Sequence, residues 1–264
     1  MEQSPKTDDH AAAPAVTATI KQRIRGLLPL WLLQFRQNHL IRNPQKHYRN
    51  LSTKEIFTRI YEEGAWGRAD ESDQKYFSGS GSHDGAVTQA YIAAVTKFLS
   101  SFAEKQNVAD LGCGDFTVGA SIRHLCGTYI ACDIVEPLIN WNRRKYKDLN
   151  VSFRALDISE DDLPAADVAF VRQVLQHLSN AHIARAVPQL AAKYKYLVLT
   201  EHLPSAGAFT PNRDKPAGAS VRSVLNSGVV LTCPPFNLPA KHESVLCEVP
   251  EGGGIIRTTL YRLA

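Results

Sequence analysis

Two glycines and an acidic residue near the middle of the chain have the spacing of a nucleoside-binding site. Gly112 and Gly114 follow the apolar stretch 108–111, and Asp133 stands at the end of the next apolar stretch. Glycines after a first strand let the backbone pass close to a ligand, and an acid at the tip of the second strand is placed to bind both hydroxyls of a ribose. The pattern predicts a site that binds an adenosine group.

The residues around these glycines indicate which adenosine cofactor binds. A dinucleotide site would have glycine or alanine at position 117, where this chain has Thr117. Asp110 and Asp115, beside the loop, would repel a pyrophosphate. S-adenosylmethionine (SAM) instead carries a sulfonium and an ammonium group, which these acids attract. The residues therefore favour SAM over NAD.

Histidine and glutamate residues after two later apolar stretches are candidates for proton transfer. His177 follows the stretch 167–171, and the ordinary histidine pKa of about 6.5 suits a general base. The alternative is a structural histidine that caps a short turn. Glu201 and His202 follow the stretch 196–200 and form a second candidate, as base and orienter. With His177 they are also candidate ligands of a divalent cation such as Mg²⁺, although neighbours on a strand point to opposite faces.

Two polar segments are candidates for binding a substrate. The segment 203–222 is too long and polar for a simple connector and is predicted to form a lid, with Asn212, Asp214 and Arg222 as hydrogen-bonding groups. The glycine-rich loop 64–84 contains Trp66, a further candidate contact. Such a polar lid suits a polyhydroxylated acceptor better than an aromatic one. The alternatives are an exposed insertion and a floppy connector.

The elements that position these residues follow from the hydrophobic pattern. Beyond residue 107, short apolar stretches alternate with helical patterns. Strands are expected at 108–111, 128–133, 151–156, 167–171 and 196–200, and helices near 116–125, 137–147 and 180–194. The stretches 243–249 and 255–263, joined by glycines, predict a hairpin. The fold class is therefore α/β, a doubly wound, Rossmann-like parallel sheet closed by an antiparallel C-terminal hairpin.

The first part of the chain is predicted to be an extension of this fold. Residues 1–19 read as a disordered tail, and 20–105 as a helical extension with a loop that covers the cofactor. Its helices are expected at 51–61, where Ser52 and Glu55 have the spacing of a capping box, and at 84–102. Residues 106–264 would form the SAM-binding domain.

Length, charge and cysteine content limit the class of protein. A chain of 264 residues forms one large domain or one domain with an extension. The net charge is +4, but residues 1–60 hold ten basic and four acidic residues, which leaves 20 basic and 22 acidic residues in the remainder. This uneven balance disfavours a dedicated nucleic-acid binder. Five cysteines without a C-x-x-C pair favour a reducing, cytoplasmic compartment.

The basic and apolar segment 20–42 leaves the relation to membranes open. Its residues suit peripheral contact with a membrane surface, or a helix that packs on the main domain. No apolar run approaches the roughly 20 residues of a membrane-spanning helix. The sequence does not determine the oligomeric state.

The glycine motif resembles that of the class I SAM-dependent methyltransferases. Asp110-Leu-Gly-Cys-Gly-Asp115 is similar to their first motif, and the closing hairpin to their antiparallel last strand. The resemblance runs from about residue 51 to the C-terminus. For Asp157, which would accept from the adenine amine, a plain turn or N-cap aspartate is the alternative. The resemblance implies a cofactor-binding set of Asp110, Gly112, Gly114, Asp133, Ile134, Asp157, Ile158 and Arg172.

A looser resemblance concerns the reaction. The Gln176-His-Leu turn, the Thr200-Glu-His-Leu-Pro segment and Pro234-Pro-Phe are similar to segments of bacterial methyltransferases that modify hydroxyls of sugars or small metabolites. It implies methyl transfer to a hydroxyl of a sugar, glycan or other small polar metabolite. No Asn-Pro-Pro-Tyr-like motif follows 167–171, which disfavours many nucleic-acid and protein N-methyltransferases. The alternatives are an RNA methyltransferase that uses the basic N-terminal segment and a non-catalytic SAM-binding protein.

Overall fold

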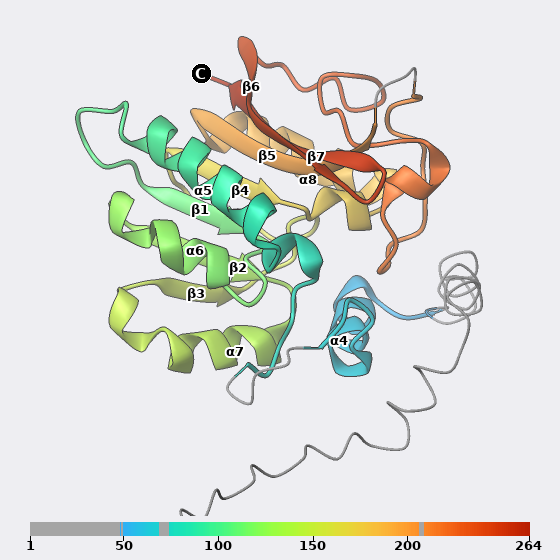
Figure 1. The fold of residues 1–264 in the computed structure, drawn as a ribbon, viewed down its shortest axis with the longest axis horizontal. Coiled ribbons are helices and arrows are strands. Elements are labelled where there is room, and N and C mark those ends of the chain that lie inside the picture. Colours follow the sequence, from blue (N-terminus) through green and yellow to red (C-terminus); the bar gives the residue numbers. More distant parts are fainter. Residues whose placement is uncertain (1–47, 49, 69–73, 206–208) are drawn as a thin grey trace, which may run out of the picture. The chain divides into compact units, whose positions relative to one another are not determined.

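Seven strands form one mixed sheet in the order β3-β2-β1-β4-β5-β7-β6 (Figure 1). The first five strands pair in parallel, and β7 pairs antiparallel with both β5 and β6. This topology confirms the predicted doubly wound sheet with a closing hairpin. The strands are β1 (Val108–Leu111), β2 (Tyr129–Asp133), β3 (Ser152–Ala155), β4 (Val168–Arg172), β5 (Tyr196–Pro204), β6 (His242–Glu251) and β7 (Gly254–Arg262).

The computed structural model describes residues 48, 50–68, 74–205 and 209–264. The predicted tail 1–19 and the segment 20–42 lie outside these residues, and so does part of the predicted lid. Within the described ranges, no helix combines the length and apolar character needed to cross a membrane. The helices are α4 (Thr53–Glu63), α5 (Gly85–Leu99), α6 (Thr117–Ile122), α7 (Glu136–Lys145) and α8 (Asn180–Lys193), with 3₁₀ turns η1 (Ser80–Ser82), η2 (Arg123–Leu125), η3 (Lys147–Leu149), η4 (Leu175–His177) and η5 (Arg222–Leu225).

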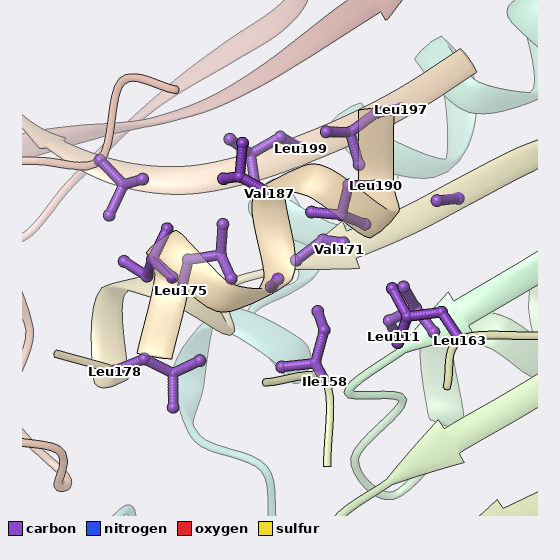
Figure 2. Packing of buried hydrophobic residues seen from close by; sticks show 14 of the residues in the cluster. Leu111, Ile158, Leu163, Val171, Leu175, Leu178, Val187, Leu190, Leu197 and Leu199 are labelled. Carbon is purple, nitrogen blue, oxygen red and sulfur yellow. The ribbon is translucent and has the colours of Figure 1, made fainter. Parts of the chain in front are cut away.

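Successive residues of a strand point to opposite sides of the sheet, and both sides are buried. Leu111, Val171 and Leu199 lie in one buried cluster with Val187 and Leu190 of α8 (Figure 2). Helices therefore cover both faces of the parallel strands, as a doubly wound fold requires. The second cluster, on the other face, includes Val108, Phe170 and Val198 of the strands with Tyr91 and Phe98 of α5 and Ile122 of α6.

Helix α4 begins and ends where its local sequence dictates. The Ser52 and Glu55 side chains cap it reciprocally, with the Ser52 N–H donating to Glu55 Oε2 at 2.8 Å. Gly64 ends the helix in the left-handed conformation, at φ 64°. The helix buries Phe57 and Ile60 against the main cluster and lies beyond the carboxyl ends of β1 and β2 (Figure 1).

Strand β5 continues four residues beyond its predicted end. The pattern indicates a strand over 196–200, but β7 pairs with β5 as far as Pro204 and Gly254. The hairpin turn before β7 uses Gly252 and Gly253, both with positive φ, as the glycine run predicts. The additional length of β5 determines where Glu201 and His202 point.

The strand order creates a crevice at the carboxyl ends of β1 and β4. From β1 the chain continues to β2 and β3 on one side, then returns to β4 on the other. In such sheets ligands bind where the order reverses, outside the carboxyl ends of the strands.

Candidate cofactor and acceptor site

A cleft opens at this crevice. Its empty volume is about 1090 Å³, its open mouth included. Trp66 and His177 also line it. The structure therefore brings together every residue that the sequence assigns to the cofactor, along with two of the seven residues that it assigns to catalysis or the acceptor. The lining includes Asp110, Gly112, Gly114, Asp133, Ile134, Asp157, Ile158 and Arg172.

The two motif glycines have no room for a side chain. Gly112 has φ 89°, and a Cβ atom there would lie 2.3 Å from Cγ2 of Val174. Gly114 has φ 54°, and its Cβ would lie 2.5 Å from Oγ of Ser78. Both positions combine positive φ with close neighbours, so only glycine fits without strain. The backbone itself forms the floor of the cleft here.

Asp133 holds the glycine loop in place. Its Oδ2 accepts from the Gly114 N–H at 3.1 Å, and its Oδ1 accepts from the Val135 N–H at 3.0 Å. Burial raises the pKa of Asp133 to about 6, against the opposing effect of these hydrogen bonds. At neutral pH the carboxylate is therefore ionised and able to accept hydrogen bonds from a ligand.

The carboxyl group of Asp110 and the guanidinium group of Arg172 both line the cleft. Tyr129 Oη donates to Asp110 Oδ2 at 3.0 Å, and burial raises the pKa of Asp110 to about 7. The guanidinium of Arg172 opposes this shift. It lies 5.1 Å from the ring centroid of Tyr91 and donates to Ser82 Oγ at 3.0 Å. Neighbouring groups of opposite charge suit the ammonium and carboxylate of an amino acid.

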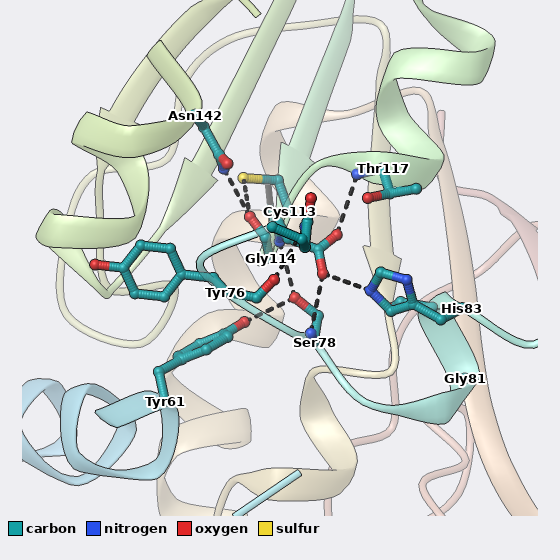
Figure 3. A network of polar contacts seen from close by, with 12 residues as sticks. Tyr61, Tyr76, Ser78, Gly81, His83, Cys113, Gly114, Thr117 and Asn142 are labelled. Atoms are coloured by element: carbon teal, nitrogen blue, oxygen red, sulfur yellow. Dashed lines mark hydrogen bonds and ion pairs between the residues drawn. The ribbon is translucent and has the colours of Figure 1, made fainter. Parts of the chain in front are cut away.

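The loop that precedes α5 and contains Ser78 and His83, here called the roof loop, covers the glycine loop 112–115 (Figure 3). The Asp115 carboxylate accepts from the Ser78 N–H at 2.9 Å, the Thr117 N–H at 3.2 Å and Nε2 of His83 at 2.7 Å. Ser78 Oγ accepts from the Asp115 N–H at 2.8 Å and contacts Tyr61 Oη at 3.0 Å. Burial raises the pKa of Asp115, but the bond and charge of His83 and the two N–H groups bring it below its ordinary value.

Several residues of the site have no sequence signal of their own. Asn142 is buried within α7 and donates to the Gly114 carbonyl at 2.7 Å. Tyr91 reads as one more apolar residue of a helix, and Ser78 as one of several small residues in a loop. Gly81, in the same loop, meets Gln173, because a Cβ there would lie 2.1 Å from its Oε1. Only the glycine-rich composition of the loop pointed towards a close approach.

His177 faces the opposite side of the cleft, on turn η4. The residue is 9% exposed, and its ring lies 4.9 Å from the Trp66 ring, centroid to centroid. Burial, with a smaller effect from the Lys215 charge, lowers the pKa of His177 to about 3. The imidazole is therefore a weak base that is neutral at physiological pH, with its Nε2 3.3 Å from Gln176 Nε2.

The segment predicted as a lid forms hydrogen bonds with backbone carbonyls of this turn. The Gly218 N–H and Lys215 Nζ donate to the His177 carbonyl at 3.0 and 3.3 Å. Arg222 Nη2 donates to the Leu178 carbonyl at 2.6 Å. The segment thereby fixes the position of the histidine.

The three polar side chains predicted to bind substrate form hydrogen bonds with the protein's own backbone, and none lines the cleft. Asn212 Nδ2 donates to the carbonyls of Val230 and Pro234, and its Oδ1 accepts from the Val230 N–H at 2.9 Å. Asp214 accepts from the Asn180 N–H at 2.7 Å. Arg222 is fully buried. A polar, loop-rich composition does not distinguish side chains that bind a ligand from those that satisfy the loop's own backbone.

This arrangement predicts that Asn212→Ala destabilises the fold without affecting cofactor binding. The substitution leaves buried carbonyl and N–H groups unpaired, so we expect the free energy of unfolding to fall by about 1–3 kcal/mol in urea denaturation. SAM affinity by titration should remain within about twofold, below 0.5 kcal/mol. Asn140→Ala, at a position whose side chain accepts only from Arg143, is the matched control. Unchanged stability in Asn212→Ala would contradict the assignment.

Glu201 and His202 do not act together at the cleft. Because β5 extends to Pro204, the two side chains point to opposite faces of the sheet. Burial raises the pKa of Glu201 to about 8, against the effect of the Arg222 charge. His202 Nε2 contacts the Glu251 carbonyl oxygen at 3.0 Å. Neither residue lines the cleft, so the predicted base-and-orienter pair is not assembled.

The predicted cation site is also not assembled. Of His177, Glu201 and His202, only the first faces the cleft. Across the part of the chain that the structure describes, no three His, Cys, Asp or Glu side chains come together in a way that could hold a metal ion.

Comparisons with known proteins agree with the fold. Residues 108–195 match a family described as a methyltransferase domain, about a third of the chain. Magnesium protoporphyrin IX methyltransferase (ChlM) from Synechocystis PCC 6803, with bound SAM, is 15% identical with a TM-score of 0.52, over 81% of this chain and 99% of that one. The N-terminal domain of EvdMO1 with SAH bound is 16% identical with a TM-score of 0.51, over 81% and 98%. No curated protein sequence matched.

A third solved structure, a SAM-dependent methyltransferase from Leishmania major, is 13% identical with a TM-score of 0.52, over 80% of this chain and 81% of that one. At such identities the likeness concerns the fold. The matched family segment begins at β1 and ends just before β5, so it contains the glycine loop, Asp133 and His177.

Proposed function

We propose that this chain, whose residues 108–195 are a methyltransferase domain within a class I SAM-dependent methyltransferase fold, transfers the methyl group of SAM to a hydroxyl of a small molecule. The observation that carries the proposal is the cleft at the switch point of the sheet. It combines the backbone of Gly112 and Gly114, the Asp133 carboxylate and the oppositely charged side chains of Asp110 and Arg172. These are the groups that a ribose and a charged methionine need.

The proposed cofactor position follows the order of these groups. Gly112 and Gly114 would hold the methionine part, Asp110 would bind its ammonium and Arg172 its carboxylate. Asp133 accepts from the ribose hydroxyls. Adenine lies beside Ile158 and Asp157, whose Oδ1 also accepts from the Ser159 N–H at 2.8 Å in a turn. Asp157 therefore has a structural role whether or not its other oxygen binds adenine.

The proposed reaction is a direct displacement. The acceptor oxygen attacks the methyl carbon in line with the sulfonium, the new C–O bond forms as the C–S bond breaks, and S-adenosylhomocysteine (SAH) leaves. The hydroxyl proton passes to the neutral imidazole of His177. Positioning and exclusion of water supply most of the rate gain.

The proposed acceptor is a small molecule with a hydroxyl group, and it is not restricted to sugars. A sugar, glycan or other small polar metabolite is the acceptor that the sequence favours, but the lid's polar side chains bind their own backbone. The N-terminal domain of EvdMO1 was also crystallised in the presence of SAH and D-fucose, so D-fucose belongs in an acceptor screen. For an RNA acceptor, the alternative, binding would weaken steeply as salt rises.

The first test is isothermal titration of the full chain with SAM, SAH and NAD, with and without Mg²⁺. We expect micromolar binding of SAM and SAH and no binding of NAD. Absence of SAM binding in every condition would overturn the proposal. A dependence on Mg²⁺ would restore a divalent cation to the mechanism. Transfer of labelled methyl from SAM to a panel of sugars and ring alcohols then identifies the acceptor, and separates an enzyme from a SAM-binding scaffold.

A further inference from the structure

One wall of the cleft is not used by the proposed cofactor position. Helix α4 and the residues after it form this wall together with turn η4. No side chain in it is charged at neutral pH, because burial holds the pKa of His177 well below neutrality. The charged lining residues Asp110, Asp115, Asp133, Asp157 and Arg172 all belong to the cofactor side. The wall consists of Thr53, Phe57, Tyr61, Trp66, His177 and Leu178.

Trp66 is at the centre of this wall. Its ring centroid lies 5.2 Å from that of Tyr61, edge to face, 6.1 Å from that of Phe57 and 4.9 Å from that of His177. Three aromatic rings and an imidazole therefore form one continuous surface. A flat apolar ring packs favourably on such a surface, at stacking or edge-to-face distances.

Apart from Nδ1 of His177, which has no hydrogen-bond partner among the described residues, the side-chain polar atoms of the wall are already engaged by the protein. Trp66 Nε1 donates to the Ala219 carbonyl at 3.2 Å. Tyr61 Oη pairs with Ser78 Oγ, and Thr53 Oγ1 contacts His182 Nε2 at 3.1 Å. A ligand with many hydroxyls would lose its water hydrogen bonds here and regain few, which costs free energy. The neutral imidazole of His177 is suited to receive a single hydroxyl.

We propose that the methyl acceptor is an uncharged molecule with a flat apolar ring that packs against Trp66 and directs one hydroxyl at His177. This inference rests on the proposed methyltransferase function and adds the acceptor's chemical class. A hydroxylated aromatic ring fulfils it most fully. A deoxysugar offers only the C–H face of a puckered ring, so the two classes are distinguishable by affinity.

The test is isothermal titration of the full chain, saturated with SAH, with naphthol and with D-fucose. We expect naphthol to bind at least about tenfold more tightly than D-fucose. Trp66→Ala should weaken naphthol binding by about tenfold, and Trp66→Phe, which keeps a ring, by about threefold. SAH affinity should remain within about twofold in both variants, since Trp66 lies on the other wall.

The matched control is Trp141→Phe, because Trp141 packs edge to face on Tyr76 and does not line the cleft. It should leave naphthol affinity unchanged. Tighter binding of D-fucose than of naphthol, or unchanged naphthol affinity in Trp66→Ala, would overturn the inference while SAH binding persists. Failure of SAH binding in the wild type would instead count against the proposed function, so the two failures are separable. If Trp66→Ala does not fold, Trp66→Phe and the wild-type comparison of ligands still decide.

Discussion

Replacing Asp133 by alanine is expected to weaken SAM and SAH binding by at least about a hundredfold, which corresponds to about 2.7 kcal/mol. The carboxylate is the proposed acceptor for two ribose hydroxyls, and hydrogen bonds to a charged group are among the strongest. It also holds the Gly114 and Val135 N–H groups, so the variant loses the shape of the glycine loop as well. Isothermal titration measures the loss directly.

Two variants separate these effects. Asp133→Asn keeps one oxygen acceptor and should lose less affinity than Asp133→Ala. Asp148→Ala removes an exposed acid on turn η3 and should bind SAM as the wild type does. Because burial raises the pKa of Asp133 to about 6, wild-type affinity should fall as pH drops below that value and the carboxyl is protonated. Binding within threefold of wild type in Asp133→Ala would refute the assignment.

His177→Ala is expected to lower kcat by about a hundredfold, with SAH affinity unchanged. General bases contribute about 10²–10⁴ in rate, and efficiency falls as the pKa of the base departs from the working pH. Burial lowers the pKa of His177 to about 3, so the lower end of that range is expected. Single-turnover transfer of labelled methyl to the identified acceptor isolates the chemical step.

The controls for His177 are chosen by chemistry. His177→Gln keeps a hydrogen-bond acceptor and should retain more activity than alanine, and His124→Ala removes an exposed histidine outside the cleft. Stability gives a second readout. The folded imidazole stays neutral while the unfolded chain takes up a proton below about pH 6.5, so the contribution of His177 to wild-type stability falls as pH drops from about 6.5 towards 3. That loss should be smaller in His177→Ala. Unchanged kcat would show that His177 is structural.

The sheet was predictable because its strands are short, apolar and bounded by turn residues. Strand β1 has the predicted bounds, and β2 begins one residue later than expected. Strand β5 was underestimated because Glu201 and His202 break the apolar run, whereas pairing with β7 carries the strand through them. The hydrophobic pattern of a short segment does not indicate pairing with a strand that is distant in the sequence.

The cofactor side of the cleft was predictable for a different reason. Gly112, Gly114 and Asp133 are constrained by backbone geometry at fixed positions along two neighbouring strands, so spacing alone indicates them. The acceptor side is formed by residues far apart in the sequence. Trp66 and His177 were candidates from their loop and turn, whereas Thr53 and Phe57 of α4 had no signal that linked them to the cleft. Asn212 and Arg222 show the converse difficulty, because a polar residue in a loop can satisfy buried backbone as readily as it binds a ligand.

The roof loop limits how far the chain can be shortened from its N-terminus without losing contacts to the proposed cofactor site. A shortened chain that begins at Gly85 would keep all seven strands and helices α5 to α8. It would nevertheless lose the Ser78 and His83 contacts to Asp115, and the Ser82 contact to Arg172. A shortened chain that keeps these contacts begins at or before Ser78. Because Tyr61 Oη of α4 contacts Ser78 Oγ at 3.0 Å, expression trials of trimmed chains should also keep α4 with its cap, from Ser52 onward.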